Sequence, residues 1–305
     1  MKSFLSFILF VAASASAEFE TIIKDQVFKD SFNLEPDEKF VELEEGFTYY
    51  KTNISPECSE YYMLVHGFSV PSYILDPVYI LLSEKSYCVI ALDLYGRGFS
   101  ENIDKPYTDR LFAEQTLQLL DHLDIEKATF LGLSNGGRVI SMIANIKPES
   151  VNALIYVASS GFLENEEVVD KSVSQKEIDN IIAQYPSLIE SQLSDFKYPE
   201  KYPDWIDKYA ELTKYKGFAK ALLSTRNNHT SLDDIHKRIN QSNIPIFTIW
   251  GESDEVVPYD TFKNKLQNIF SRRNEFFVLE SAHLPHMENP EQFNGYLLDI
   301  LEKLN

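Results

Sequence analysis

Short apolar runs recur along this chain and are separated by segments with helical spacing. Six runs are apolar and short enough to be buried strands: residues 61–65, 88–92, 128–131, 151–158, 246–250 and 275–279. Residues 40–43 and 47–50 predict a hairpin before them. Between the strands, residues 108–123 place apolar side chains at helical intervals, and residues 138–144 also predict a helix.

The pattern changes at two places. Between about residues 160 and 243 it gives way to several short amphipathic runs, interrupted by aromatic and proline-containing stretches. The first 17 residues carry one basic residue, Lys2, then an apolar run over 4–11 and the small residues Ala15-Ser16-Ala17. This order is typical of a secretory signal peptide cleaved near Ala17, so we expect residues 18–305 to be the mature, exported domain. An uncleaved N-terminal anchor is the alternative, although the apolar run is short for a bilayer.

A G-x-S-x-G sequence, Gly132-Leu133-Ser134-Asn135-Gly136, stands between a predicted strand and a predicted helix. In that position it predicts a nucleophile elbow, a turn too sharp for side chains at its two glycine positions. The turn would lift the Ser134 hydroxyl clear of the sheet and direct the helix N-terminus at the group it attacks. An inert turn serine is the alternative.

Three further motifs follow predicted strands. Residues 61–65 lead into His66-Gly67-Phe68, residues 246–250 into Gly251-Glu252-Ser253-Asp254, and residues 275–279 into Ser281-Ala282-His283. Together with the elbow, these motifs resemble the alpha/beta-hydrolase superfamily over about residues 39–160 and 244–303. The resemblance implies an α/β fold with a mostly parallel, eight-stranded sheet and helices on both faces. It also implies a helical cap inserted at about residues 160–243.

The resemblance assigns a role to each motif. Ser134 would be the nucleophile, because a serine hydroxyl beside a base can form an acyl-enzyme. His283 would be that base, and Asp254 would hold the imidazole in the required tautomer. The backbone N–H groups of Phe68 and Asn135 would form the oxyanion hole.

Two of these roles have competitors nearby in the sequence. Glu252 and Glu255 compete with Asp254 for the acid, and the G-x-x-D-x-x-V-P register favours Asp254. His286 competes with His283 for the base, but the Pro-His-Met-Glu-Asn-Pro run after His283 resembles the family's usual sequel. We expect no metal at this histidine pair, because a proline separates the two and no H-E-x-x-H is present. No cofactor is expected.

A serine at the elbow selects the chemistry. A serine nucleophile adds to a carbonyl carbon and becomes acylated. The aspartate found at this position in related dehalogenases and epoxide hydrolases becomes alkylated instead. The sequence therefore predicts a serine hydrolase that cleaves small or monoacyl carboxylic esters. An amide or peptide hydrolase on the same triad is the alternative, and so is a ligand-binding relative without turnover. Asn135 stands where peptidase-like relatives carry a tryptophan, which weakens the peptidase alternative.

Composition limits the partners. The chain has 28 basic and 47 acidic residues, a net charge of −19, so we expect no nucleic acid partner. The same charge disfavours adsorption to anionic membranes, and no run beyond the first residues is long enough to span a bilayer. We expect a small-molecule ester substrate and no stable membrane insertion.

The only two cysteines are Cys58 and Cys88. In the sheet order that the resemblance implies, they lie near the same end of two neighbouring parallel strands, opposite the active site. Export would permit a structural disulfide between them, and two unpaired buried thiols are the alternative.

Overall fold

The structure is a computed structural model that describes residues 19–163 and 172–304. The predicted signal peptide, residues 1–17, lies outside the described residues, as does the stretch 164–171 of the predicted cap. Within the described ranges, no helix is both long and apolar enough to cross a membrane.

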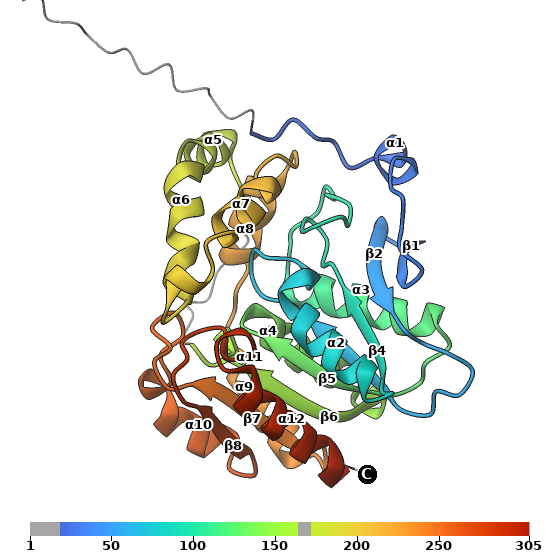
Figure 1. Ribbon diagram of the computed structural model, residues 1–305, viewed down its shortest axis with the longest axis vertical. Helices are drawn as coiled ribbons and strands as arrows, with labels where there is room; N and C mark the ends of the chain where they lie inside the picture. Colours follow the sequence, from blue (N-terminus) through green and yellow to red (C-terminus); the bar gives the residue numbers. More distant parts are fainter. Residues whose placement is uncertain (1–18, 164–171, 305) are drawn as a thin grey trace, which may run out of the picture.

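One eight-stranded sheet forms the centre of the molecule (Figure 1). Its strands are β1 (Glu38–Glu42), β2 (Phe47–Thr52), β3 (Tyr61–Val65), β4 (Cys88–Leu92), β5 (Ala128–Leu133), β6 (Val151–Val157), β7 (Ile246–Gly251) and β8 (Asn274–Val278). The order across the sheet is β1-β2-β4-β3-β5-β6-β7-β8. β2 pairs antiparallel with β1 and β4, and all other pairs are parallel. The predicted α/β fold with a mostly parallel eight-stranded sheet is confirmed.

Helices cover both faces of this sheet (Figure 1), which explains why its central parallel strands β3, β5 and β7 are mostly apolar and buried. The helix α1 (Gln26–Asp30) precedes the first strand. The helices between and after the strands, apart from those of the β6–β7 segment, are α2 (Asp76–Glu84), α3 (Asp109–His122), α4 (Asn135–Ile146), α10 (Lys263–Ile269), α11 (Pro285–Glu288) and α12 (Pro290–Leu304). α3 and α4 pack together, and α2 contacts α11 and α12. All residues of β5 and of β7 are buried.

Polar residues set the start of the predicted helices. The Thr108 side chain accepts a hydrogen bond from the Leu111 N–H at 3.0 Å and begins α3. The Asn289 side chain accepts from the Gln292 N–H at 3.3 Å at the start of α12. Both satisfy an N–H group that a first helical turn leaves without a partner.

The segment between β6 and β7, residues 160–243, is here called the insertion. Its helices are α5 (Gln175–Ala183), α6 (Tyr185–Ser191), α7 (Trp205–Leu212), α8 (Phe218–Asn227) and α9 (Asp233–Gln241). α5 to α8 lie above the sheet in Figure 1, beyond the carboxyl ends of the strands, and α9 returns to pack on α4. The insertion therefore stands over the edge of the sheet where Ser134 lies.

Cys58 and Cys88 form a disulfide bond, with Cα atoms 5.9 Å apart. Cys88 begins β4 and lies opposite Tyr61, the first residue of β3. The bond therefore joins two neighbouring parallel strands at their amino ends, on the side of the sheet away from Ser134. The predicted pairing is confirmed over two unpaired thiols.

Candidate active site

The four motifs meet at one edge of the sheet. Phe68 lies three residues beyond the end of β3, Ser134 directly follows β5, Asp254 follows β7 and His283 follows β8. The strand order turns around between β3 and β5, since β4 lies on one side of β3 and β6 on the other side of β5. In open α/β sheets, ligands bind beyond the carboxyl ends of the strands at such a point.

The turn at Ser134 has the backbone geometry of a nucleophile elbow. Ser134 has φ 52° and ψ −114°, a conformation that a residue with a side chain rarely adopts. A Cβ at Gly132 would lie 2.5 Å from the Gly136 carbonyl oxygen, and one at Gly136 would lie 2.2 Å from the Val65 carbonyl oxygen. Both positions require glycine, because the start of α4 passes so close to β5 and β3.

Asp254 is buried and holds His283 through one carboxylate oxygen. Its Oδ1 accepts hydrogen bonds from the N–H groups of Val256 and Val257, both at 2.9 Å. Its Oδ2 lies 3.0 Å from His283 Nδ1. The carboxylate is therefore fixed by its own loop, and it orients the imidazole with Nε2 left for another partner.

The protonation of His283 depends on opposing influences. Burial is the largest single influence and lowers the pKa of the imidazole, but the carboxylates of Asp254, Asp195 and Glu288 favour the charged form. The net result raises the pKa of His283 above its usual value of 6.5. A base whose charged form is stabilised in this way is suited to accept a proton during a reaction.

The competing residues occupy different surroundings. His286 is buried, its Nε2 lies 2.7 Å from the Ile74 carbonyl oxygen, and burial lowers its pKa to about 4. That ring therefore donates to the backbone as a neutral imidazole. Glu252 is exposed and pairs with Lys197 at 3.1 Å.

Ser134 and His283 line the same cavity, which has a volume of about 200 Å³. Apolar side chains, among them Val70, Ile74 and Leu284, form much of its wall. Among the described residues, no hydrogen bond joins the Ser134 hydroxyl to the His283 ring. In many apo enzymes the bond between nucleophile and base forms only when substrate is present.

The loop after β3 passes beside the nucleophile. A Cβ built on Gly67 would lie 3.5 Å from the Ser134 Cβ. The neighbouring Phe68 lines the cavity, and within the described ranges neither its N–H nor the Asn135 N–H has a hydrogen-bond partner in the protein. Two free donors flanking Ser134 are what an oxyanion would require.

Buried side chains hold this loop in place. His66 Nε2 accepts a hydrogen bond from the Leu94 N–H at 2.9 Å, and its Nδ1 lies 2.9 Å from the Gly67 carbonyl oxygen. Burial lowers the pKa of His66 to about 3, so the ring is neutral and donates through Nδ1. The buried Arg97 donates through Nε to the Phe68 carbonyl at 2.9 Å.

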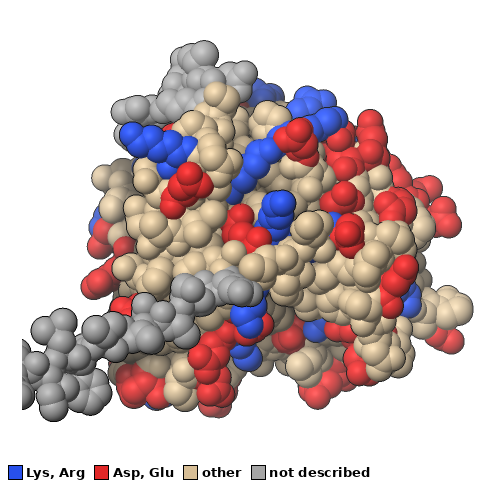
Figure 2. Space-filling view, turned by 90° about the horizontal axis from the view of Figure 1, so that it is seen from above, with Lys and Arg blue, Asp and Glu red and all other residues tan. Residues whose placement is uncertain are grey.

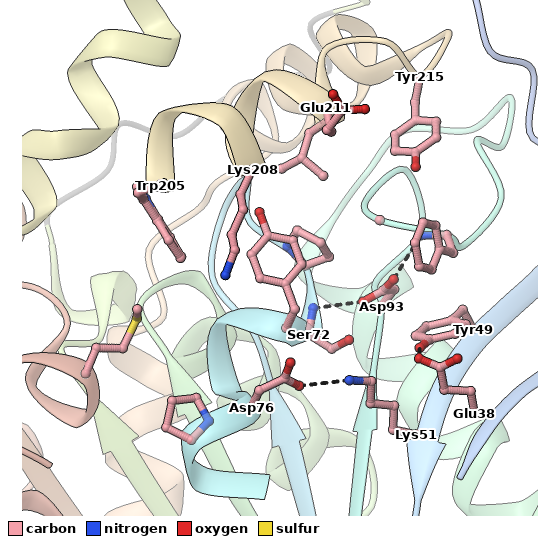
Figure 3. A pocket seen from close by; sticks show the side chains of 17 residues that line it. Glu38, Tyr49, Lys51, Ser72, Asp76, Asp93, Trp205, Lys208, Glu211 and Tyr215 are labelled. Atoms are coloured by element: carbon pink, nitrogen blue, oxygen red, sulfur yellow. Dashed lines mark hydrogen bonds and ion pairs between the residues drawn. The ribbon is translucent and has the colours of Figure 1, made fainter. Parts of the chain in front are cut away.

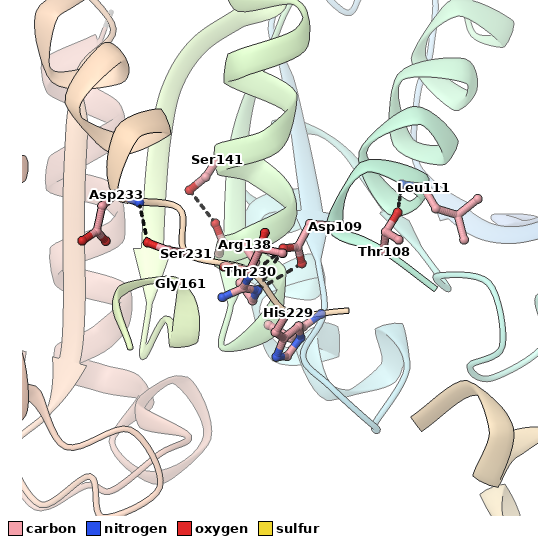
Figure 4. A network of polar contacts seen from close by, with 12 residues as sticks. Thr108, Asp109, Leu111, Arg138, Ser141, Gly161, His229, Thr230, Ser231 and Asp233 are labelled. Atoms are coloured by element: carbon pink, nitrogen blue, oxygen red, sulfur yellow. Dashed lines mark hydrogen bonds and ion pairs between the residues drawn. The ribbon is translucent and has the colours of Figure 1, made fainter. Parts of the chain in front are cut away.

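A buried polar network around Arg138, in the first turns of α4, is not predicted by any sequence motif (Figure 4). Arg138, four residues after the nucleophile, forms a buried two-point ion pair with Asp109, with Nε–Oδ1 at 3.0 Å and Nη2–Oδ2 at 2.7 Å. Its Nη2 also donates to the Thr230 carbonyl at 2.6 Å. His229 Nε2 lies 2.8 Å from Asn135 Oδ1. The network joins the elbow to α3 and to the insertion, and no motif singles out these residues.

A larger cavity, of about 530 Å³, adjoins the same loop (Figure 3). Pro71, Ser72 and Tyr73 line it, but Ser134 and His283 do not. Several of its charged groups already have partners. Lys51 pairs with Asp76 at 3.0 Å, as Figure 3 shows. The smaller cavity is therefore the candidate active site, because Ser134 and His283, the predicted nucleophile and base, both line it.

Acidic residues dominate the charged surface. Figure 2 views the molecule from the side of the insertion, and acidic side chains are spread across this face, with a dense group along its right-hand edge. Within the described residues, no group of three or more His, Cys, Asp or Glu side chains could hold a metal ion.

Comparisons with known proteins agree with this fold. The model of the family described as alpha/beta hydrolase fold matches residues 63–290. The chain is 26% identical over 257 residues to the uncharacterized hydrolase YugF of Bacillus subtilis (strain 168), covering 78% of this chain and 88% of that one. It is 25% identical over 222 residues to 3-oxoadipate enol-lactonase 2 of Acinetobacter baylyi, covering 73% and 81% respectively. A thermophilic esterase from Thermogutta terrifontis has a similar fold, with a TM-score of 0.69 and 19% identity over 87% of this chain and 99% of that chain.

Proposed function

Because the chain belongs to the alpha/beta hydrolase fold family, we propose that it is a serine hydrolase that cleaves small carboxylic esters. The chain is a hydrolase of this fold, and the proposal adds the nucleophile and the substrate class. One observation carries it: His283, held by Asp254 at 3.0 Å, lines the same cavity as Ser134 on a strained elbow. That combination supports acyl transfer, because it pairs a weak nucleophile with an oriented base.

In this mechanism Ser134 Oγ adds to the ester carbonyl while His283 Nε2 takes the hydroxyl proton. The N–H groups of Phe68 and Asn135 stabilise the oxyanion, and each such donor is worth about 3 kcal/mol in comparable sites. Collapse of the intermediate breaks the ester C–O bond, and His283 returns the proton to the departing alcohol. Water, activated by the same histidine, then releases the carboxylic acid and restores Ser134.

The insertion acts as a cap in this proposal. Gln192 and Asp195, from the short helix η4 (Gln192–Asp195), line the cavity together with Ser134. A cavity of about 200 Å³ is smaller than most sites for drug-sized ligands, which favours small substrates. We therefore expect soluble esters to be better substrates than an emulsified lipid.

We further propose that the protein is exported. The disulfide between Cys58 and Cys88 supports this, since such bonds persist mainly in oxidising compartments. The signal peptide predicted over residues 1–17 would direct the export. N-terminal sequencing of the secreted protein tests this, and a mature chain that still begins at Met1 would contradict cleavage near Ala17.

Labelling with a fluorophosphonate tests the nucleophile. We expect one label per chain, on Ser134, and none on the Ser134→Ala variant. Turnover of p-nitrophenyl acetate should fall at least about a thousandfold in that variant. Labelling that persists in Ser134→Ala would move the nucleophile elsewhere.

A substrate panel tests the reaction class. Aminoacyl anilides measured beside the ester distinguish an esterase from an amide hydrolase, and faster turnover of the anilides would favour the amidase. A protein that binds both compounds but neither turns over nor accepts the label would instead be a ligand-binding member of the family.

A further inference from the structure

The cap places one carboxylate inside the cavity of the candidate active site. Asp195, at the end of η4, lines this cavity together with Ser134 and His283. Its position is fixed by the backbone, because its carbonyl oxygen accepts a hydrogen bond from the His283 N–H at 3.0 Å. Beyond its contribution to the raised pKa of His283, the triad mechanism assigns no task to this side chain.

Among the described residues, His283 interacts electrostatically with the Asp195 carboxylate, but no group forms a hydrogen bond or a close ion pair with it. The side chain is half-buried. The nearby Lys197 points its charge at Glu252 and Glu280, at 3.1 and 3.3 Å. Glu288, a further acid near His283, differs because it accepts hydrogen bonds from two backbone N–H groups. The Asp195 carboxylate is therefore available to a donor or a positive charge that a ligand brings into the cavity.

The reaction sets which part of the substrate lies near Asp195. His283 delivers a proton to the departing alcohol, so the alcohol part of an ester must pass beside the imidazole. Asp195 is bound to the backbone of that same histidine. The Asp195 carboxylate also lines the cavity and interacts electrostatically with the His283 ring, so the alcohol is the part of the substrate that we expect nearest to it.

We propose that Asp195 binds a positive charge in the alcohol part of the substrate. The preferred substrates are then small esters of amino alcohols, with a protonated or quaternary amine. This inference rests on the proposed ester hydrolysis and adds the class of alcohol to it.

The charges around the cavity favour the same class. No lysine or arginine lines it, and Asp254 lies directly behind His283. Burial raises the pKa of the Asp195 carboxyl to about 6, so the group is charged above that pH. A cation in the cavity would be attracted with less screening than a surface pair experiences, whereas an anionic alcohol would be repelled.

A matched pair of esters tests the inference. Acetylcholine and 3,3-dimethylbutyl acetate have the same shape, but only acetylcholine carries a charge. At about pH 8, where Asp195 is ionised, we expect kcat/KM for acetylcholine to exceed that for the neutral ester by roughly tenfold or more. The Asp195→Asn variant should bring this ratio close to one.

Glu190→Gln is the matched control, because Glu190 is an exposed acid on α6 that does not line the cavity. It removes the same charge and should leave the ratio unchanged. If the ratio of the two kcat/KM values fell equally in both variants, the net negative charge of the protein, and not Asp195, would select the cationic ester.

Two other outcomes would overturn the inference. A wild-type ratio of one or less would show that the cavity does not favour a cation. Equal losses for both esters in Asp195→Asn, with a shifted pH–rate profile, would show that Asp195 acts through His283 instead. Binding of choline and 3,3-dimethylbutan-1-ol to the Ser134→Ala protein provides a readout without turnover. If the wild type hydrolyses neither ester and takes no fluorophosphonate label, the proposed function itself is wrong, whether or not the Ser134→Ala protein binds choline.

Discussion

The Asp254→Asn substitution examines the part of the site that the structure defines best. Oδ1 of Asp254 accepts two backbone N–H groups at 2.9 Å, from Val256 and Val257. An amide NH₂ cannot accept these bonds, so the asparagine must keep its oxygen there and turn its NH₂ toward His283. The imidazole then has to accept at Nδ1 and carry its proton on Nε2. In that tautomer the ring cannot take the proton from Ser134.

The size of the loss follows from two contributions. Reversing the amide would leave the buried Val257 N–H and the partly buried Val256 N–H without acceptors. At about 1–3 kcal/mol for a buried group and less for a partly buried one, a total of about 3 kcal/mol makes the productive tautomer rarer by roughly a hundredfold. The imidazolium also loses a charged partner, a hydrogen bond worth about 1.5–3 kcal/mol, or about ten- to a hundredfold in rate. Together they predict a fall in kcat of about 10³ to 10⁴. Turnover of p-nitrophenyl acetate measures this fall, and the thermal unfolding midpoint establishes that the variant is folded.

Glu252→Gln is the control for this prediction, because Glu252 is an exposed acid two residues away. We expect it to retain most activity. A folded Asp254→Asn variant within tenfold of wild type, or a larger loss in Glu252→Gln, would refute the assignment of the acid.

Three other predictions concern the base, its titration and the disulfide. His283→Ala should lower kcat/KM at least about a thousandfold. His286→Ala should mainly lower the unfolding midpoint, because the His286 ring bonds to the Ile74 carbonyl. A larger loss of activity in His286→Ala than in His283→Ala would assign the base to His286. The pKa of His283 is raised, and only the neutral ring accepts a proton, so kcat/KM should decline as pH falls through a midpoint above 6.5. A midpoint below 6 in the pH–rate profile would contradict the influence of the three carboxylates on the ring. Removing the Cys58–Cys88 bond, which closes a loop of 30 residues, should lower the unfolding free energy by about 3–4 kcal/mol in urea titrations and leave kcat unchanged. A double variant that is folded but inactive would show that the bond is not purely structural.

Local sequence signals were sufficient to predict the strands and the residues that follow them. Ser134, Asp254 and His283 each lie shortly after an apolar run, and a parallel sheet brings the carboxyl ends of its strands to one edge. Two glycines that permit no Cβ mark the elbow. For these residues, chain position and spatial position are closely linked.

The contacts made by the insertion could not be predicted in this way. Asp195 ends a short helix without apolar periodicity, and it meets His283 only because the cap folds back over the sheet. Arg138 and Asp109 are 29 residues apart, and Arg138 and Thr230 are 92 apart. Their pairing depends on how whole helices pack, and a single sequence carries little information about that packing.

The strained backbone at Ser134 has a consequence for how this protein can evolve. Holding a residue with a side chain at φ 52° costs folding free energy of the order of 1–3 kcal/mol, which a glycine at this position would not incur. Selection for thermal stability alone would therefore favour replacing this serine. In the proposed mechanism only selection for turnover maintains it, so a lineage that lost its need for the reaction would be expected to lose Ser134 before it lost the surrounding fold.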